Sequence, residues 1–266
     1  METSNTLLTN KVAVITGAGD GIGKGIALMF ARSGAHVVVA DRNAAAGEAA
    51  AAEINSLGRK GLAIHTDIRR SDQVGALITR SVAELGGVDI LVNNVGGSPR
   101  QPFLDNGETR WQKIVELNLM SVFYCTGAVV RHMIERKRGG AIVNISSIEG
   151  SRAAPGFAVY SACKGGMDTF TKTAALEFAA HGIRVNCIAP DIIDTPVTSA
   201  LKGSTNLPRV IPLGRMGTAE EVGGVAVFLA SDLASYVTGE TIHVDGGTWA
   251  ACGWQREGSG WVNVPR

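Results

Sequence analysis

The chain has 266 residues, 45% of them hydrophobic, and it carries 25 basic against 24 acidic side chains. This length suits one large α/β domain with a substantial core, and a net charge of +1 gives no electrostatic basis for binding nucleic acid. The four cysteines and five histidines are isolated from one another, so we expect reduced thiols and no metal site.

The N-terminal stretch METSNTLLTNKVAV contains Glu2 and lacks a basic lead into a long apolar run, so we expect no signal peptide. The most apolar helical stretch, from Leu117 to Val130, is interrupted by Asn118, Ser121 and Thr126. It falls short of the roughly 20 residues that span a bilayer. We therefore predict a cytoplasmic protein with no membrane segment.

Short runs rich in β-branched residues recur along the chain. They read KVAVIT, HVVVAD, LAIHTD, DILVNN, AIVNIS, RVNCIA and ETIHVD. Continuous apolar runs without polar alternation are typical of strands that are buried on both faces of a parallel sheet.

Helical patterns separate these runs. The first begins near Gly21, presents Ile22, Ile26, Met29 and Phe30 on one face, and ends at Gly34. Others cover residues 44–57, 71–85, 109–135, 158–181 and 218–230. The alternation predicts a Rossmann-type, doubly wound parallel sheet with helices on both faces. We expect one domain over residues 1–266, with 248–266 as a C-terminal tail.

The stretch TGAGDGIGKG, residues 16–25, packs five glycines and a lysine between the first predicted strand and helix. An ATP-binding loop requires glycine five residues before its Gly-Lys pair, where this chain has Ala18, and Ser or Thr after that pair. The spacing G-x-G-x-x-G also fails, because its third glycine falls on Ile22. The remaining pattern is Gly17-x-x-x-Gly21-x-Gly23, which lets backbone approach a pyrophosphate at a helix N-terminus.

An acidic residue indicates which dinucleotide this loop binds. Asp41 ends the second predicted strand about 20 residues after the loop, where a carboxylate accepts the adenosine ribose hydroxyls and repels a 2′-phosphate. Asp20 adds negative charge inside the loop, whereas Arg42 favours a phosphate unless it points to solvent. We predict NAD as the cofactor and disfavour NADP.

Tyr160 and Lys164 are four residues apart on a predicted helix, so they share one face. A nearby ammonium favours phenolate, so we expect the Tyr160 pKa to lie below its ordinary value of about 10. Such a tyrosine is a general acid–base near neutral pH. The same spacing also occurs in exposed helix pairs without function.

Further motifs accompany this pair in a fixed order. They are Gly17-x-x-x-Gly21-x-Gly23, NNVG at 93–96, Asn118, Ser147 thirteen positions before Tyr160, and Lys164. With them the sequence resembles the classical short-chain dehydrogenase/reductase family from Lys11 to Gly247. The resemblance implies a homotetramer, in which the helices of Asn118 and Tyr160 pack across a dimer interface.

The resemblance also implies residue roles. Ser147 orients the substrate oxygen, Tyr160 exchanges the proton, Lys164 binds the nicotinamide ribose and lowers the Tyr160 pKa, and Asn118 holds a relay water. The implied cofactor-binding residues are Gly17, Asp20, Gly21, Ile22, Gly23, Asp41, Arg42, Asp67, Ile68, Asn93, Gly96, Tyr160, Lys164, Pro190, Ile193 and Thr195. Structural alternatives stay open for four residues: Asn118 as a helix-kinking polar residue, Asp67 as a strand-end cap, and Asn93 and Asn94 as links between strands.

Three positions depart from the family pattern or extend it. Asp191 follows Pro190 where the family has glycine, and we expect it to occupy a left-handed backbone conformation at some cost. Val95 replaces the usual alanine beside the nicotinamide. Glu149, two residues after Ser147, faces either substrate or solvent, and we favour solvent.

These features predict an NAD-dependent enzyme that interconverts a small-molecule secondary alcohol, apolar or cyclic and including hydroxysteroids, with its ketone. A 3-oxoacyl thioester reductase is the alternative within the family. It is disfavoured because the sequence has no dense basic patch that would bind an acidic carrier protein. A non-catalytic NAD-binding sensor or scaffold is the alternative from another class. It is disfavoured because such a protein needs no proton donor at Tyr160.

The tail holds Trp249, Trp254 and Trp261, three of the chain's four tryptophans. A disordered tail would be poor in aromatic residues. These rings either pack on their own subunit or at a subunit interface, or the tail crosses to a neighbouring subunit and helps to wall its substrate pocket. The sequence leaves both open.

Overall fold

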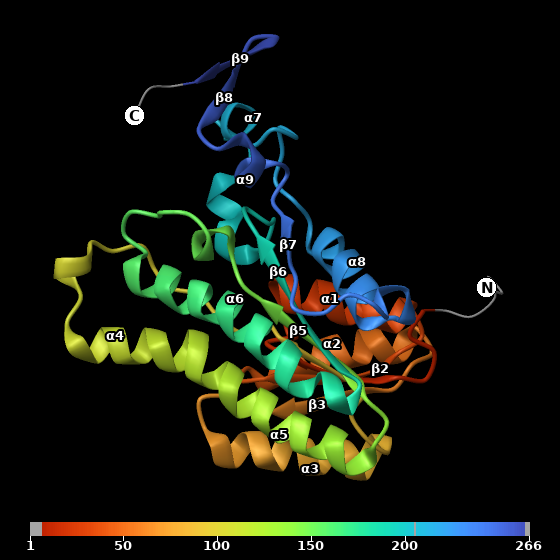
Figure 1. The fold of residues 1–266 in the computed structure, drawn as a ribbon. Coiled ribbons are helices and arrows are strands. Elements are labelled where there is room, and N and C mark those ends of the chain that lie inside the picture. Colours follow the sequence, from red (N-terminus) through yellow and green to blue (C-terminus); the bar gives the residue numbers. More distant parts are fainter. Residues whose placement is uncertain (1–6, 205, 264–266) are drawn as a thin grey trace.

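A parallel sheet forms the centre of the computed structural model, which describes residues 7–204 and 206–263 (Figure 1). Its seven strands lie in the order β3-β2-β1-β4-β5-β6-β7, and all neighbouring pairs are parallel. Their bounds are β1 Val12–Thr16, β2 His36–Asp41, β3 Gly61–His65, β4 Ile90–Asn93, β5 Gly140–Ile145, β6 Ile183–Pro190 and β7 Thr241–Val244. All seven predicted strands are confirmed.

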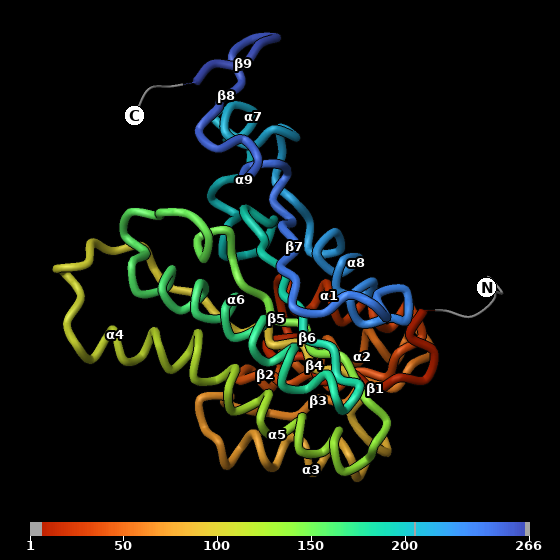
Figure 2. The backbone as a smooth tube through the Cα atoms, in the orientation of Figure 1, coloured from red at the N-terminus to blue at the C-terminus, as the bar shows by residue number. Residues whose placement is uncertain are grey.

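Helices cover both faces of the sheet, as the alternating pattern predicts (Figure 2). The helices are α1 Gly21–Arg32, α2 Ala44–Ser56, α3 Ser71–Leu85, α4 Glu108–Val115, α5 Ser121–Arg136, α6 Ala158–Phe178, α7 Leu207–Val210, α8 Ala219–Ala230 and α9 Thr248–Ala251. Short 3₁₀ turns cover Phe103–Asp105, Ile148–Gly150, Ala179–His181, Pro196–Leu201 and Asp232–Ala234. The Rossmann-type doubly wound fold is confirmed.

Two apolar cores, one on each face, hold the layers together. Successive residues of β1 point to opposite faces: Ala13 and Ile15 pack under α1, α2 and α8, whereas Val12 and Val14 pack under α3, α5 and α6. A strand whose two faces are both buried has no polar positions, because neither face meets water. This explains why the strands are visible in the sequence as unbroken apolar runs.

Side-chain caps begin three of the helices. Asp20 accepts the Gly21 N–H at the start of α1, with a distance of 2.7 Å, and Asn43 accepts the Ala46 N–H at the start of α2. At α8, Thr218 and Glu221 form a reciprocal capping box. Caps of this kind satisfy backbone N–H groups that have no partner within the helix, and each is worth about 1 kcal/mol.

The helical segment Glu108–Arg136 is longer than its most apolar stretch suggests. A π-helical turn at Glu116–Met120 joins α4 to α5 without a break, giving 29 residues that by length and composition could cross a membrane. This length agrees with the helical pattern predicted at 109–135, and the polar residues within it do not interrupt the helix. Val122, Val129 and Met133 on α5 are buried, and the segment packs against α3 and α6. It is therefore a core helix of this fold.

The tail contains structure that the sequence does not predict. β8 Trp254–Glu257 and β9 Gly260–Asn263 form an antiparallel hairpin that extends away from the sheet beside α7 (Figure 1). Trp254 and Trp261 remain 48% and 46% exposed. Trp249 stacks on His243 of the same chain, with ring centroids 5.3 Å apart. One of the three tail rings therefore packs on its own subunit, while the hairpin rings lie largely at the surface.

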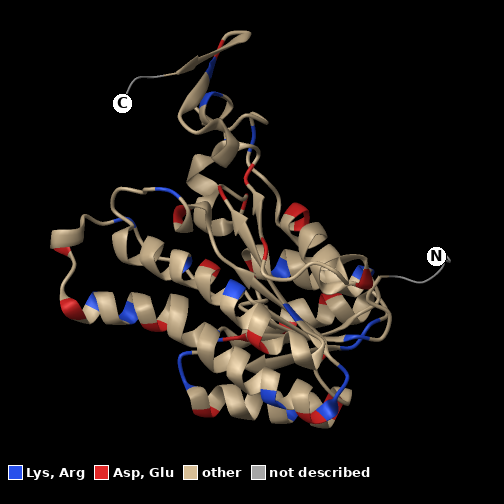
Figure 3. Ribbon diagram, in the orientation of Figure 1, with Lys and Arg blue, Asp and Glu red and all other residues tan. Residues whose placement is uncertain are grey.

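The order of the sheet decides where a site can lie. The chain winds outward from β1 to β3, returns to β4 beside β1, and continues in the opposite direction. The loops after β1 and β4 therefore diverge and leave a crevice at the carboxyl ends of these strands. Basic and acidic residues are interspersed along the surrounding helices (Figure 3).

Candidate active site

Two adjoining cavities occupy this crevice, with volumes of about 850 and 430 Å³. Gly17, Val95 and Gly96 line both of them, so together they form one elongated groove. The larger lies beside the ends of β2 and β3, and the smaller beside the ends of β5 and β6. A groove of this length across the switch point is suited to a dinucleotide.

The glycine loop is packed too tightly for side chains at two positions. Gly17 has a φ of +65°, and an added Cβ there would lie 2.8 Å from Val95 Cγ2. A Cβ on Gly23 would lie 2.2 Å from the Gly17 carbonyl oxygen, because the first turn of α1 touches the loop. Gly21 and Ile22, at the start of α1, line the smaller cavity. The arrangement leaves backbone N–H groups near the groove, as anion binding requires.

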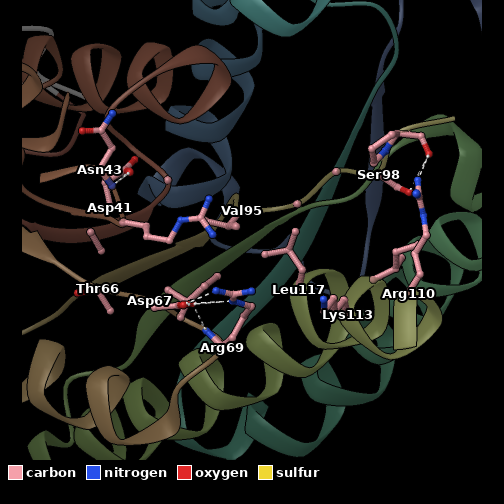
Figure 4. A pocket seen from close by; sticks show the side chains of 18 of the residues that line it. Asp41, Asn43, Thr66, Asp67, Arg69, Val95, Ser98, Arg110, Lys113 and Leu117 are labelled. Atoms are coloured by element: carbon pink, nitrogen blue, oxygen red, sulfur yellow. Dashed lines mark hydrogen bonds and ion pairs between the residues drawn. The ribbon is translucent and has the colours of Figure 1, made fainter. Parts of the chain in front are cut away.

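Asp41 at the end of β2 stiffens this loop and lines the larger cavity. Its carboxylate oxygens accept the Gly19 N–H at 2.9 Å and the Asn43 N–H at 2.8 Å. Figure 4 shows Asp41 beside Asn43 on one side of the cavity. Arg42 lines the same cavity, whereas Asp20 lies in the lining of the smaller one. The predicted preference against a 2′-phosphate would therefore depend on Asp41 more than on Asp20.

Asp67 and Ile68 follow β3 and line the larger cavity, as the resemblance implies. The Arg69 guanidinium hydrogen-bonds the Asp67 carboxylate and lowers its pKa to about 2 (Figure 4). The same carboxylate accepts the Arg69 N–H at 3.1 Å. Asp67 thus acts as a strand-end cap and also borders the groove, so the two interpretations are compatible.

Ser147, Tyr160 and Lys164 come together at the smaller cavity. Ser147 follows β5, and Tyr160 and Lys164 lie one turn apart on α6. Lys164 is fully buried: its Nζ donates to the Ile145 carbonyl at 2.7 Å and lies 5.6 Å from the centre of the Tyr160 ring. The neighbouring Ser146 is engaged elsewhere, because its hydroxyl donates to the Lys164 carbonyl.

The expectation that Lys164 lowers the Tyr160 pKa is wrong. Burial raises the pKa of Tyr160 to about 12, and its hydrogen bond with Ser147 only partly offsets this effect. Burial also lowers the pKa of Lys164 to about 8. Removing a phenolate or an ammonium from water costs more than the two groups recover across 5.6 Å. The lysine alone does not activate the tyrosine.

Asn118 lies in the π-helical turn between α4 and α5 and is completely buried. Its Oδ1 accepts the Gly97 N–H at 2.7 Å, and its amide donates to the Gly97 and Ile114 carbonyls. A Cβ on Gly96 would lie within 3.0 Å of both Asn118 Oδ1 and Lys164 Nζ. Asn118 therefore clamps the loop after β4 against Lys164, a structural role that is compatible with the predicted water relay.

The side-chain amides of Asn93 and Asn94 have different hydrogen-bond partners. The Asn93 amide is buried in the sheet and donates to Thr126 and Asn144, so the strand-linking alternative describes its side chain. The Asn94 amide donates to the Thr16 and Gly17 carbonyls and lies in the wall of the smaller cavity. Asn94, directly after β4, therefore also links neighbouring segments, as the structural alternative predicts, and in addition it borders the cavity.

The segment after β6 closes the smaller cavity with Pro190, Asp191, Ile193 and Thr195. Asp191 is not left-handed: among the described residues, the non-glycine positions with positive φ are Asn10, Lys137 and Cys252. The turn thus tolerates Asp191 without the expected backbone strain.

A charged group beside Ser147 is the main feature that the sequence interpretation misses. Arg152 pairs with Glu149 at 3.3 Å and with Asp191 at 3.5 Å, and Glu149 accepts a hydrogen bond from the Ser147 hydroxyl. The preference for solvent at Glu149 is therefore wrong. Burial raises the pKa of Asp191, whose side chain is 7% exposed. The short turn Ile148–Gly150 folds Glu149 back onto Ser147.

The fold and the site together define a dinucleotide-binding oxidoreductase, and comparison with known proteins agrees. A family model described as "Enoyl-(Acyl carrier protein) reductase" matches residues 17–248. The chain is 43% identical to a 3-oxoacyl-[acyl-carrier-protein] reductase FabG of Chlamydia muridarum, over 91% of this chain and 99% of the relative. It is 40% identical to a cis-4-hydroxycyclohexanecarboxylate dehydrogenase of Sinomonas cyclohexanicum, over 89% and 96%.

Solved structures are similar over most of their length. A short-chain type dehydrogenase/reductase from Mycobacterium marinum has a TM-score of 0.87 at 38% identity, covering 92% of this chain and 97% of the other. A 7α-hydroxysteroid dehydrogenase complexed with NADH and 7-oxo glycochenodeoxycholic acid has a TM-score of 0.87 at 36% identity, covering 93% and 98%. The chain belongs to the classical short-chain dehydrogenase/reductase family, and it is an oxidoreductase acting on CH–OH or C=O groups with a nicotinamide cofactor.

Proposed function

We propose that this protein is an NAD(H)-dependent enzyme that interconverts a secondary alcohol, apolar or cyclic, with its ketone. The observation that carries the proposal is one groove with Asp41 at one end and the set Ser147, Tyr160 and Lys164 at the other. In a dinucleotide that spans the groove, Asp41 would hold the ribose hydroxyls and Tyr160 would lie on the side of the reactive ring. The assignment of NAD over NADP depends on the negative charge of Asp41.

The residues of the groove fit such a cofactor. Gly17, Gly21 and Ile22 line the groove, and the close packing of Gly23 on the Gly17 carbonyl keeps the first turn of α1 beside the place where a pyrophosphate would bind. When bound, the nicotinamide accepts or delivers the hydride and brings a positive charge to the site in its oxidised form. The remaining binding roles follow the residues named from the sequence, with the Asn94 side chain in place of the Asn93 side chain.

The chain's own residues handle the proton. Tyr160 donates its phenolic proton to the oxygen of a ketone being reduced, or accepts the hydroxyl proton of an alcohol being oxidised. Ser147 holds that oxygen within reach, and Lys164 binds the nicotinamide ribose. Because burial raises the Tyr160 pKa to about 12, the cationic oxidised cofactor is the group that favours the phenolate at working pH.

A second function, reduction of a 3-oxoacyl thioester, is favoured by two observations. Several relatives are named 3-oxoacyl-[acyl-carrier-protein] reductases. Arg110 and Lys113 on α4 also line the larger cavity, where they give a basic edge to the groove (Figure 4). This edge is sparse, and the charged side chains around it are of mixed sign. We therefore keep the secondary alcohol as the first proposal.

A substrate panel distinguishes the two functions. The purified protein is assayed with NAD and NADP against aliphatic, cyclic and steroidal secondary alcohols, and with NADH and NADPH against their ketones and an acetoacetyl thioester. The proposal expects the highest kcat/KM for a small alcohol–ketone pair with NAD(H). A higher kcat/KM for the thioester with NADPH would replace it by the second function. Protein that binds NADH but turns over nothing would instead support a sensor.

Three properties complete the proposal. We expect a homotetramer, because the family resemblance implies one, and its mass in solution is measurable by light scattering. We expect it in the cytoplasm, as for the metabolic enzymes that it resembles. Its partner is the small-molecule substrate.

A further inference from the structure

Glu149 lies against Ser147, which lines the groove, although the proposed reaction requires no carboxylate there. Its carboxylate Oε2 accepts a hydrogen bond from Ser147 Oγ, and its own N–H donates back to the same oxygen at 3.3 Å. The Glu149 side chain is only 21% exposed. Two contacts between one carboxylate residue and one hydroxyl fix the direction in which that hydroxyl points.

A serine hydroxyl has a single proton to donate. Tyr160 and Ser147 line the same cavity, and a hydrogen bond between the two hydroxyls stabilises phenolate only when Ser147 is the donor. An ionised carboxylate is a pure acceptor, so it takes the Ser147 proton and leaves lone pairs facing Tyr160. Glu149 and a Tyr160 phenolate therefore compete for the same proton.

Arg152 controls how strongly Glu149 competes. Its guanidinium lies between two carboxylates, 3.3 Å from Glu149 Oε1 and 3.5 Å from Asp191 Oδ1. Arg152 is 36% exposed, so its charge is partly screened by water. It holds Glu149 in place and offsets part of its negative charge.

We propose that Glu149 is a positioning residue that acts through Ser147: its carboxylate takes the Ser147 proton, deprives the Tyr160 phenolate of a donor, and moves alcohol oxidation to higher pH, while Arg152 limits this effect. The inference depends on the proposed alcohol oxidation. The opposite signs of Glu149 and Arg152 make it testable, because removing either charge moves the same equilibrium in opposite directions.

Charged and titratable groups that face this pair come from several elements. The groups around Tyr160 are Cys163 and Lys164 on α6 and Glu149 from the turn before it. The groups around Glu149 are Arg152, Tyr160 and Asp191, which follows β6. Behind Lys164 lie Cys187 on β6 and Asp168 on α6. After the burial that dominates, the Glu149 charge further raises the pKa of Tyr160. Glu149 and Arg152 are the pair whose contacts reach Ser147.

The test compares the pH dependence of kcat/KM for alcohol oxidation in three variants. Glu149→Gln keeps the size and an acceptor oxygen but removes the charge, so its activity should rise at lower pH than in the wild type. Glu149→Ala removes the acceptor too. It should move the rising part of the pH profile of kcat/KM, its acid limb, about 1 pH unit lower, which is a tenfold gain in kcat/KM on the acid side. Arg152→Met should move the limb to higher pH. Glu48→Gln, an exposed carboxylate on α2, is the matched control and should leave the profile unchanged.

A second readout does not require turnover. The absorbance of tyrosinate, titrated in each variant and corrected with the same titration of a Tyr160→Phe background, reports the ionisation of Tyr160 directly. The account expects Glu149→Ala to titrate below the wild type and Arg152→Met above it. The inference would be overturned if the pH profiles of kcat/KM and the tyrosinate titrations stayed unchanged, or if they moved in the same direction in both variants. A wild type that oxidises no alcohol but shows these shifts would instead overturn the proposed function alone.

Discussion

Replacing Asp41 by Ala should change the choice between NAD and NADP. The carboxylate lines the larger cavity at the end of β2, where it offers acceptors to two ribose hydroxyls. A hydrogen bond to a charged group contributes about 1.5–3 kcal/mol, so losing one of them reduces NAD kcat/KM by roughly 10- to 100-fold. NADP gains over the same change because a negative charge no longer faces its 2′-phosphate. We expect the ratio of kcat/KM for NAD over NADP to fall by at least about 100-fold.

Asp41 also accepts the Gly19 and Asn43 N–H groups, so its loss could loosen the loop itself. Asp41→Asn separates these effects, because the amide keeps one acceptor oxygen and a similar shape but has no charge. It should move the ratio in the same direction with less loss of NAD use. Both variants are assayed with one substrate at fixed salt concentration. A wild type that already prefers NADP, or a ratio that Asp41→Ala leaves unchanged, would refute the reasoning.

Three further predictions concern the loop, the tail and the response to acid. Gly23→Ala places a Cβ 2.2 Å from a loop carbonyl oxygen, so it should weaken NADH binding at least ~10-fold and destabilise the protein by about 1–3 kcal/mol. The control is Gly75→Ala on α3, whose Cβ would meet nothing within 4 Å and should stabilise the protein by up to about 1 kcal/mol. Deleting residues from Ala250 onward should raise KM for the best substrate and leave NADH affinity and tetramer mass intact. An unchanged KM would mean that the tail does not line the substrate pocket. A smaller oligomer would mean that the tail stabilises subunit assembly. Arg69→Met should raise the Asp67 pKa toward its ordinary value. In the wild type the Asp67 pKa is lowered from 3.8 to about 2, so this carboxyl stabilises the folded state above pH 3.8 and loses that contribution as the pH falls toward 2. Thermal unfolding of the Arg69→Met variant should therefore depend less on pH across that range.

The sheet and its helices could be predicted because burial on both faces leaves a local signal. Each strand shows an unbroken apolar run, and residues such as Val14 and Ile15 alternate between the two cores without a polar position. The hairpin Trp254–Asn263 gave no such signal, because it is exposed and polar on most positions. The helical pattern at 109–135 predicted the continuous helix Glu108–Arg136 to within one residue at each end. Its polar residues, including Asn118, bond within the helix or to the adjacent loop and so do not interrupt it.

The site was predictable where spacing alone fixes geometry. Tyr160 and Lys164 had to share a face of α6, and Ser147 had to lie at the carboxyl end of β5. The properties that depend on three-dimensional surroundings were not. The Tyr160 pKa reflects burial, which no spacing reveals, and the approach of Glu149 to Ser147 depends on how a three-residue turn folds.

The most direct test of the central claim is Tyr160→Phe, which keeps the ring and removes the proton. We expect kcat for the best alcohol to fall at least ~100-fold, the scale of general acid–base catalysis, while the Kd for NADH stays within the error of the wild type. Tyr236→Phe, at a fully exposed tyrosine, should change neither quantity. If the Tyr160→Phe variant kept near-normal turnover, Tyr160 would not exchange the proton and the proposed mechanism would be wrong.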